Sequence, residues 1–551
     1  MLTFVVKHLF LYNDTMKGKG ASVMHQHKYA KLTIVETSDT HGQIFPILYG
    51  TNTYESIGLA KIATYIRHLR RTEENLLLID NGDSIQGTPL TYHYVKKQSH
   101  LSNPVILTFN QLHYDAAIIG NHEFNYGLST LKQSVSEAQF PILSANILNN
   151  QTKEPYFGKP YTIKILPEGI KVAILGLTTP YIPNWEKAEH IEGLEFEDAV
   201  ASAKKWIPLI KEKEQPDLFI VSYHGGFERN LKTGEPTEAI TGENQAYQLC
   251  QEVEGMDVLL TGHQHRLLAD ELNGVTIVQP GNFGAFMGQI DIEFIMDSDH
   301  KWKCLSKKAS LVPVKEWKED EEILRLILPY EEKTQAWLDQ PIGHIQGDMI
   351  IKDPFLARIK EHPFVEFINH VQMEASNVDI SNTALFSNHA MGLPTNITMR
   401  DIVSNYIYPN TLMVIELSGQ DIKDGLEKSA TYFIVNDQGE IAVNPPFIDP
   451  KPQHYNYDMW EGIQYTIDVG KPAGERIVSL MKNGEALNLK QMYHVVMNNY
   501  RATGGGNYSM YKGKKVIREI QTDMTELLAN YFSKNGTVKA TVNNNWKVIQ
   551  T

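Results

Sequence analysis

The chain is short of cysteine and of positive charge. Its 551 residues include only Cys250 and Cys304. Two distant cysteines provide neither a disulfide framework nor a four-thiolate zinc site, so cysteine usage does not define the redox compartment. Lys and Arg number 51 against 65 Asp and Glu, a net charge of −14. Coating a nucleic acid requires a basic face, so the composition argues against a nucleic-acid polymer as partner and leaves open a local pocket for one phosphate.

Long hydrophobic runs are also absent. No stretch reaches the roughly 18 apolar residues of a membrane span, and no lipid-anchor motif is evident. Residues 1–12 are apolar but are broken by Lys7 and His8, and they lack a basic start and a small-residue cleavage site. This is a poor match to a signal peptide. We therefore treat residues 1–28 as an N-terminal extension and expect a cytoplasmic protein by default; no feature of the sequence indicates an oligomeric state.

The length predicts at least two domains, because 551 residues exceed what one core organises. Apolar content of 42% and charged content of 21% are ordinary for a globular protein. Over residues 29–317 short apolar runs alternate with amphipathic segments, which predicts a layered α/β domain. Residues 318–345 read as an acidic linker helix that Pro329 interrupts. Residues 346–551 form the second predicted domain.

Several buried strands are predicted in the first domain. Each is a short run rich in Val, Ile and Leu, and a helix is expected at residues 57–70. Several of these runs stop at a polar cluster, where chemistry is expected. The predicted strands are residues 32–35, 76–79, 116–119, 172–175, 218–221, 258–260 and 275–278.

The stretch at residues 115–127 shows such an ending most clearly. An apolar run reaches Gly120 and is followed at once by Asn121 and His122. Asn is a neutral oxygen ligand suited to a divalent cation, and the neighbouring His, facing another way, is free to reach a substrate. The alternative interpretation is a polar turn that caps the next helix, with Asn121 in the left-handed conformation.

Four other strand ends carry similar side chains. Asp39 and His41 are two residues apart, so on an extended segment they point to the same side. Asp83 is a candidate bridging carboxylate between two cations. Each motif alone also fits a turn or a hydrogen-bonded structural histidine, whereas together they indicate a two-metal hydrolase with its ligands at one sheet edge. The candidate ligands are Asp39, His41, Asp83, Asn121, His224, His263 and His265.

This order of motifs resembles the calcineurin-like metallophosphoesterases. Over nearly the whole chain it is similar to the bacterial 5'-nucleotidase and 2',3'-cyclic phosphodiesterase family. The resemblance implies a four-layer α/β/β/α catalytic domain joined to a smaller α/β nucleotide-binding domain, with a hinge near Pro329 that brings the two together. Members of this family are often exported.

The resemblance also implies a mechanism. Two divalent metal ions, of a kind the sequence does not choose among Mn, Zn, Fe and Co, would activate a hydroxide that attacks phosphorus. His122 would be catalytic, stabilising the transition state or protonating the leaving alkoxide without being a permanent ligand. By motif position, Asp39, His41, Asp83 and His265 would hold one metal, and Asp83, Asn121, His224 and His263 the other.

The second domain supplies residues that resemble the family's base site. Tyr408 and Tyr500 stand where aromatic side chains sandwich the base, and Asn410 would add a polar contact. Taken alone, either tyrosine also fits a core residue.

Some positions depart from the 5'-nucleotidase pattern. Asn125 stands where those enzymes commonly have an Asp that orients the histidine, and Gly506 replaces an acidic ribose contact. These departures resemble the 2',3'-cyclic phosphodiesterase and 3'-nucleotidase branch. Asn388 and His389 lie where the family often has a phosphate-gripping Arg; they can contact a phosphate oxygen but offer no bidentate fork.

The leading hypothesis is therefore an enzyme acting on a small-molecule nucleotide, a 2',3'-cyclic nucleotide 2'-phosphodiesterase and 3'-nucleotidase. The alternative is a 5'-nucleotidase that acts on nucleoside monophosphates or UDP-sugars. A non-catalytic nucleotide-binding module is a remote alternative, because such a module has no need of two cations.

Overall fold

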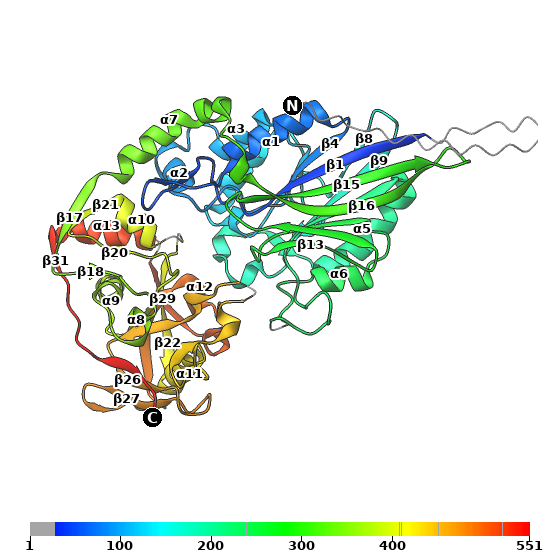
Figure 1. The fold of residues 1–551 in the computed structure, drawn as a ribbon. Helices are drawn as coiled ribbons and strands as arrows, with labels where there is room; N and C mark the ends of the chain where they lie inside the picture. Colours follow the sequence, from blue (N-terminus) through cyan, green and yellow to red (C-terminus); the bar gives the residue numbers. More distant parts are fainter. Residues whose placement is uncertain (1–27, 239, 407, 409, 450, 521) are drawn as a thin grey trace, which may run out of the picture.

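The computed structural model describes residues 28–551 except residues 239, 407, 409, 450 and 521. The expectations for residues 1–28 therefore lie, apart from residue 28, outside the described residues. The chain forms two lobes joined by helix α7 (Glu321–Leu338), with the first lobe coloured blue to green and the second green-yellow to red (Figure 1). No helix in the described part of the chain is long and apolar enough to cross a membrane.

The first sheet of the first lobe contains the first three predicted strands. Strands β1, β4 and β5 run parallel, so their carboxyl ends reach the same edge. Strands β15 and β16 extend the sheet with antiparallel pairing on the other side of β1. In spatial order the sheet is β16 (Trp302–Pro313), β15 (Phe286–Met296), β1 (Tyr29–Thr37), β4 (Leu76–Asp80), β5 (Ala116–Ile118) and β6 (Ile142–Leu143).

A second six-stranded sheet holds the remaining predicted strands. Its four central strands are parallel, and an antiparallel strand borders each side. In order it consists of β13 (Leu267–Leu272), β14 (Val275–Pro280), β12 (Val258–Thr261), β11 (Leu218–His224), β9 (Lys171–Thr178) and β8 (Tyr161–Ile165).

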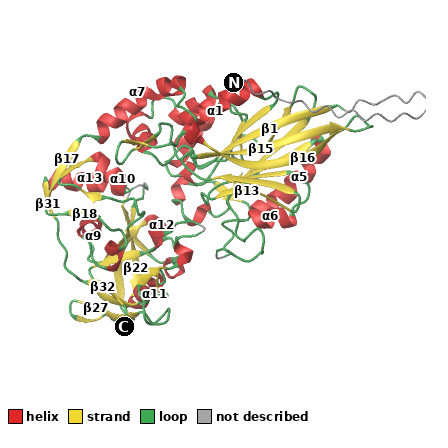
Figure 2. Ribbon diagram, viewed as in Figure 1, coloured by secondary structure: helices red, strands yellow, loops and turns green. Residues whose placement is uncertain are grey.

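The two sheets stack face to face, with helices on both outer sides (Figure 2). Successive residues of one strand face different layers: Ile34 packs in the core between the sheets, and Val35 packs under the helices. This alternation is why the strands read as continuous apolar runs. The four-layer α/β/β/α prediction is confirmed. The helices on one side are α1 (Leu59–Thr72), α2 (Pro89–His93), α3 (Pro104–Gln111), α4 (Gly127–Glu137) and α7, and on the other α5 (Ala199–Glu214) and α6 (Ala246–Glu252).

Pro329 does not interrupt the linker helix, so that prediction is wrong. Helix α7 continues through it. Pro329 removes one helical hydrogen bond, but buried Ile327 and Tyr330 on either side of it pack into the core of the first lobe, and this burial offsets the loss. The linker helix is thus packed on the first lobe rather than suspended between the two.

The second lobe has its own core, gathered around a five-stranded sheet. Its largest fully buried side chain is Trp460. The five-stranded sheet consists, in order, of β25 (Asp458–Glu461), β19 (Ser381–Ala384), β29 (Met492–Asn498), β22 (Leu412–Ser418) and β30 (Val516–Ile520). A second sheet contains β21 (Asn396–Thr398), β17 (Pro341–Gln346) and β31 (Thr537–Lys539), and a third contains β28 (Glu485–Ala486), β27 (Ile477–Lys482), β26 (Gln464–Asp468) and β32 (Trp546–Ile549). The helices of this lobe are α8 (Leu356–Ile359), α9 (Pro363–Ser376), α10 (Met399–Asn405), α11 (Gly419–Ala430), α12 (Asn499–Ala502) and α13 (Met524–Asn535).

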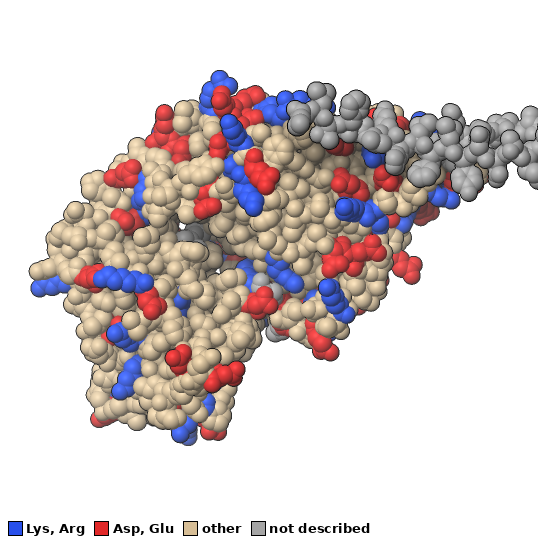
Figure 3. Space-filling view, in the orientation of Figure 1, with Lys and Arg blue, Asp and Glu red and all other residues tan. Residues whose placement is uncertain are grey.

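Charges are dispersed over the face of the molecule shown in Figure 3. On the face in Figure 3, Lys and Arg side chains lie among Asp and Glu, and no continuous basic patch covers that face.

Short paired strands complete the fold: β2 (Ile47–Leu48) with β3 (Thr53–Tyr54), β7 (Ile147–Asn149) with β10 (Leu194–Phe196), β18 (Met349–Ile350) with β20 (Gly392–Leu393), and β23 (Phe433–Val435) with β24 (Ile441–Val443).

Candidate active site

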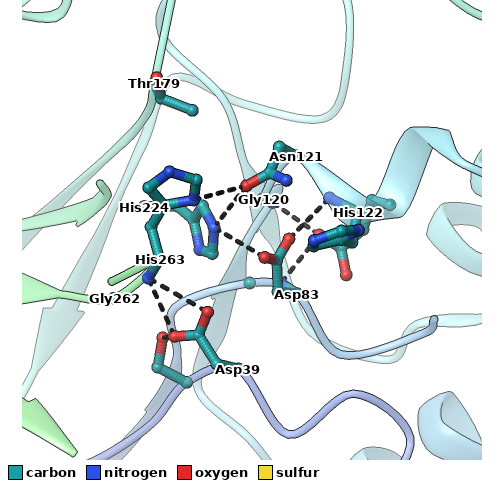
Figure 4. A network of polar contacts seen from close by, with 12 residues as sticks. Asp39, Asp83, Gly120, Asn121, His122, Thr179, His224, Gly262 and His263 are labelled. Carbon is teal, nitrogen blue, oxygen red and sulfur yellow. Dashed lines mark hydrogen bonds and ion pairs between the residues drawn. The ribbon is translucent and has the colours of Figure 1, made fainter. Parts of the chain in front are cut away.

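The polar strand ends converge, but from two sheets instead of one sheet edge as predicted. Loops after β1, β4 and β5 come from the first sheet, and loops after β11 and β12 come from the second (Figure 4). The reason is that the facing parallel strands of both sheets end on the same side of the stack. Two groups of side chains have potential ligand atoms within 4.8 Å of one another, namely Asp39, His41 and His265, and Asp83, His224 and His263.

In the first group, two imidazole nitrogens and a carboxylate oxygen face one another. His41 Nδ1 lies 3.0 Å from the carbonyl oxygen of Gln86, so it carries the proton and His41 Nε2 bears a lone pair. That lone pair faces His265 Nε2 at 3.2 Å, and His265 Nε2 lies 3.4 Å from Asp39 Oδ1. Nitrogens and a carboxylate in this arrangement need a proton or a cation between them.

The second group repeats this arrangement. His224 Nδ1 lies 2.7 Å from the carbonyl oxygen of Asn81, so His224 Nε2 is the free ring nitrogen. It lies 3.1 Å from both Asp83 Oδ2 and Asn121 Oδ1. His263 Nδ1 is 2.8 Å from the same Asn121 oxygen. Two imidazoles, a carboxylate and an amide oxygen therefore surround one point, a donor set suited to a divalent transition metal.

Burial and charge tune these groups for metal binding. Burial lowers the pKa of His41 to about 3, and it is the main reason that the pKa values of His263 and His265 are also lowered. For Asp83, burial acts to raise the pKa, but the charge of His224 overrides it and the pKa lies well below its usual range. The same carboxylate raises the pKa of His224 to about 10 against the effect of burial. His224 must therefore lose a proton to become a ligand.

The backbone is left-handed at many of these residues. Asp39, His41, Asp83, His263 and His265 have φ values of 51°, 49°, 55°, 66° and 56°. Asp39 and His41 thus lie in a turn after β1, and the prediction of an extended segment is wrong. A non-glycine residue at positive φ is strained, and such strain concentrates where function requires a particular side-chain direction.

Two glycines make room for the carboxylates. A Cβ atom on Gly120 would come within 2.6 Å of the Asp83 nitrogen and still closer to Asp83 Oδ1. A Cβ atom on Gly262 would lie 2.7 Å from Asp39 Oδ2. Both glycines are needed because the backbone of one loop approaches the ligand side chain of another.

Glu123 and Glu243 support the two groups, and the sequence analysis missed both. The buried Glu123 carboxylate accepts backbone N–H groups of Asp83 at 2.9 Å, Ser84 at 2.6 Å and Gly120 at 2.7 Å. Glu243 Oε1 accepts from His263 Nε2 at 2.9 Å and so directs His263 Nδ1 toward Asn121. The sequence signal for Glu123 is that it directly follows the Asn121–His122 pair. No sequence signal marks Glu243.

His122 borders the first group without belonging to either. Its ring centroid lies 5.3 Å from that of His41, and its Nδ1 lies 2.7 Å from Asn125 Oδ1. The neighbouring Asn121 has φ −79°, so the alternative of a left-handed Asn121 in a capping turn is wrong. His122 instead starts a short 3-10 helix (His122–Phe124) that turns its ring away from Asn121 (Figure 4).

A cavity lies between the lobes beside the second group. Its walls include His263 and Glu243 from the first lobe, and Lys451, Tyr455 and Tyr500 from the second. The rings of Tyr455 and Tyr500 are 6.5 Å apart and nearly perpendicular, at 73°. Lys451 Nζ donates to the carbonyl oxygen of His263 at 3.1 Å. Of the predicted base contacts, Tyr500 lines this cavity.

The other predicted base contacts are not among the described residues that line it. Tyr408 packs edge-on against Phe386, with ring centroids 5.6 Å apart. The Asn410 carbonyl oxygen accepts from the Met524 amide at 2.8 Å. Tyr455, which the sequence analysis missed, is the second aromatic side chain in the cavity wall.

An arginine that the sequence analysis did not identify contacts the segment at Asn388 and His389. Buried Arg358 of α8 donates from Nη1 to Asn388 Oδ1 at 2.8 Å. Asn388 Nδ2 is also 3.0 Å from His454 Nε2, while His389 is exposed. Asn388 is therefore held within the second lobe by Arg358 and His454.

Comparisons with known proteins cover both lobes. The family model for calcineurin-like phosphoesterases matches residues 32–267, and that for the 5'-nucleotidase C-terminal domain matches residues 341–513. A Staphylococcus aureus protein assigned as a 5'-nucleotidase has a crystal structure with 36% identity and a TM-score of 0.87, covering 95% of this chain and 100% of that one.

Two curated relatives extend this comparison. The 2',3'-cyclic-nucleotide 2'-phosphodiesterase/3'-nucleotidase of Yersinia enterocolitica is 28% identical over 94% of this chain and 88% of its own length. The trifunctional nucleotide phosphoesterase YfkN of Bacillus subtilis is also 28% identical over 94% of this chain, which spans only 39% of that protein's length.

Proposed function

The chain belongs to the calcineurin-like phosphoesterases with a 5'-nucleotidase C-terminal domain, and from that premise we propose that it hydrolyses 2',3'-cyclic nucleotides and 3'-nucleotides. One observation carries the proposal: two groups of convergent ligand atoms, with His122 beside the first, and a cavity with aromatic walls that borders the second. The first feature suits phosphoester hydrolysis, and the second suits a nucleoside.

The donor sets fit two divalent metal ions. We assign Asp39, His41 and His265 to one ion and Asn121, His224 and His263 to the other, with Asp83 shared. The short contacts support this assignment, since each group brings imidazole nitrogens within 3.2 Å of one another or of an amide oxygen, and such groups are ligands of a divalent transition metal. When bound, two such ions lower the pKa of a water molecule and neutralise charge on the phosphoryl oxygens.

His122 supplies the proton for the leaving oxygen. Asn125 accepts the hydrogen of Nδ1, so Nε2 is the ring atom available to the substrate. Asp83 Oδ1 accepts the His122 backbone N–H at 2.7 Å, which fixes the distance of this histidine from the ligand loop. This hydrogen bond therefore links the residue that donates the proton to the carboxylate that would hold the metals.

The cavity supports a nucleotide substrate. Tyr500 and Tyr455 offer two aromatic faces for a base, and Lys451 brings a positive charge to the edge of the metal groups. At Gly506, where the resemblance to 5'-nucleotidases led us to expect an acidic ribose contact, a Cβ atom would lie 2.5 Å from Arg501 Nη1 and overlap Asn456. No ribose-binding carboxylate fits there, which favours an ester of the ribose hydroxyls themselves.

The cavity is narrow in the described conformation. The cavity measures about 100 Å³, less than the roughly 300–1,000 Å³ of typical ligand sites. Thr503 Oγ1 donates across it to the Asn184 carbonyl oxygen at 3.1 Å. We infer that the lobes separate to admit the nucleotide and release the product.

The 5'-nucleotidase alternative is supported by the name of the Staphylococcus aureus protein, which has the higher identity. Turnover of several substrates, measured side by side, distinguishes the 5'-nucleotidase alternative from the proposed activity. The purified chain is stripped with a chelator, Mn²⁺, Zn²⁺, Fe²⁺ or Co²⁺ is added back, and 2',3'-cyclic AMP, 3'-AMP, 5'-AMP and UDP-glucose are each offered. We expect preference for the first two. Preference for 5'-AMP or UDP-glucose would replace the proposal with the alternative, and no turnover with any metal would leave a binding module.

A further inference from the structure

A carboxylate lies behind His122. It does not contact the ring directly, as an aspartate at position 125 would, but lies beyond the Asn125 side chain. Asn125 Oδ1 lies 2.7 Å from His122 Nδ1, and Asn125 Nδ2 donates to Glu186 Oε2 at 2.7 Å. Glu186 belongs to the loop between the 3-10 turns Ile182–Asn184 and Ala188–His190, 61 residues from Asn125 in sequence. No motif around Glu186 indicated a role.

The Glu186 side chain is buried and held by several hydrogen bonds. Its side chain is only 6% exposed. Its other oxygen, Oε1, accepts from the Lys187 amide and faces His190 Nδ1, both at 2.9 Å. Both oxygens of this carboxylate are thus engaged, and only Oε2 is directed at Asn125.

The chemistry of these groups fixes the direction of every hydrogen. A carboxylate only accepts, so Asn125 must turn its NH₂ group toward Glu186. The Asn125 carbonyl oxygen then faces His122, and His122 Nδ1 must carry a hydrogen. Without Glu186, the amide could rotate by half a turn and present NH₂ to His122 instead, which stabilises the opposite tautomer.

We propose that Glu186 is a positioning residue that, through Asn125, orients the His122 ring so that Nδ1 keeps its hydrogen and Nε2 faces the substrate. This inference rests on the proposed function of His122. As the P–O bond breaks, the Nε2 proton of the imidazolium moves to the leaving alkoxide oxygen, and a neutral imidazole with hydrogen on Nδ1 remains. The uncharged Asn125 separates the carboxylate from the ring, so Glu186 orients His122 without contacting it directly.

Glu186→Gln tests the proposal kinetically, with Glu189→Gln as matched control, because Glu189 lies in the same loop and is 57% exposed at its side chain. Hydrolysis of 3'-AMP, or of whichever nucleotide the wild type cleaves, is compared with hydrolysis of p-nitrophenyl phosphate. For the nucleotide we expect kcat to fall about 10- to 100-fold, the range for partners of active-site ligands, with KM nearly unchanged. For p-nitrophenyl phosphate the loss should be under about threefold, since that leaving group departs without a proton.

A double variant keeps the test independent of folding. Asn125→Asp combined with Glu186→Gln places a carboxylate directly on His122 Nδ1 and should recover most of the lost kcat. Asn125→Asp alone, with Glu186 still in place, sets two carboxylates side by side, so its kcat should lie below that of the double variant. Equal losses on both substrates, no recovery in the double variant, or a Glu186→Gln kcat equal to that of the control would overturn the proposal.

Nitrogen-15 NMR of labelled histidine provides a readout that needs no substrate. The His122 signals are assigned by their disappearance in His122→Ala. We expect a single Nδ1–H tautomer in the wild type and a mixture of tautomers in Glu186→Gln. An unchanged tautomer in that variant would overturn the relay whatever the substrate, whereas a wild type that shows the tautomer but cleaves no nucleotide would count against the proposed function only.

Discussion

Lys451 Nζ lies 3.1 Å from the carbonyl oxygen of His263, so a cation of the second lobe sits against a candidate metal ligand of the first. Its charge contributes to the lowered pKa of both His263 and His265, after burial. Within the described residues, no carboxylate lies at ion-pair distance from this amine. Lys451 is therefore available to a phosphate bound between the lobes.

Replacing Lys451 by Met tests this availability. We expect KM for the nucleotide to rise about 10- to 150-fold, because a hydrogen bond to a charged group contributes about 1.5–3 kcal/mol, and the salt dependence of KM to weaken. The control is Lys471→Met, at an exposed position of the same lobe. Equal KM values in the two variants would remove Lys451 from the phosphate site.

Replacing His122 by Ala should abolish turnover while both metals stay bound. His122 belongs to neither ligand group, and general acid catalysis contributes roughly 10²- to 10⁴-fold. Activity on the nucleotide is measured together with metal content by elemental analysis. Unchanged turnover contradicts the catalytic role, and loss of metal shows that the ring is a ligand after all.

Replacing Tyr500 by Ala should weaken nucleotide binding, because base stacking on an aromatic ring contributes about 1–3 kcal/mol, or about 5- to 150-fold in KM. Tyr500→Phe retains the ring and should stay close to the wild type. The same pair of substitutions at Tyr408, which is not among the described cavity-lining residues, distinguishes the two predicted base contacts. If Tyr500→Phe loses as much as Tyr500→Ala, stacking is not what Tyr500 provides.

Replacing Gly120 by Ala should displace Asp83, because the new Cβ atom would lie 2.6 Å from the Asp83 nitrogen. We expect metal affinity to fall at least about tenfold, as it does when the support of a ligand is disturbed. Titration of the stripped protein with Mn²⁺ measures it, with thermal unfolding as the check that the fold persists. Wild-type affinity in a folded variant would show that Asp83 can move without cost.

Glu361 should make stability depend on pH. It lies in a group with Glu366 and Glu461, and burial together with Glu366 raises the pKa of Glu361 to about 8. A carboxyl group whose pKa rises on folding keeps its proton in the native state, so stability should fall as the pH rises from about 4.5 to about 8. Glu361 is partly exposed, so the effect should stay below about 1 kcal/mol.

Glu361→Gln should flatten that dependence and raise the unfolding midpoint at pH 8 by up to about 4 °C. Thermal unfolding at pH 5, 6.5 and 8 measures it, and Glu475→Gln, at an exposed position of the same lobe, is the control. A wild type that gains stability over this range, as it would with a cation between the three carboxylates, contradicts the prediction.

Much of the first lobe follows from sequence alone. Residues such as Ile34 and Val35 are both apolar because each faces a different buried layer, so the strands were visible as short runs. The polar residues after those runs were equally visible, because each polar cluster directly follows an apolar run. Asp39, His41, Asp83, Asn121 and the three histidines needed no more information than that.

The tertiary structure alone decided which distant segments meet. Three features depend on packing between distant segments: the ligand loops come from two sheets, with His41 and His265 224 residues apart, Glu186 stands behind Asn125, and Lys451 reaches His263. Periodicity in a sequence indicates whether a residue is buried, but it does not indicate which residues it packs against. The helix through Pro329 was missed for the same reason, because the burial that offsets its lost hydrogen bond is supplied by the other helices of the first lobe.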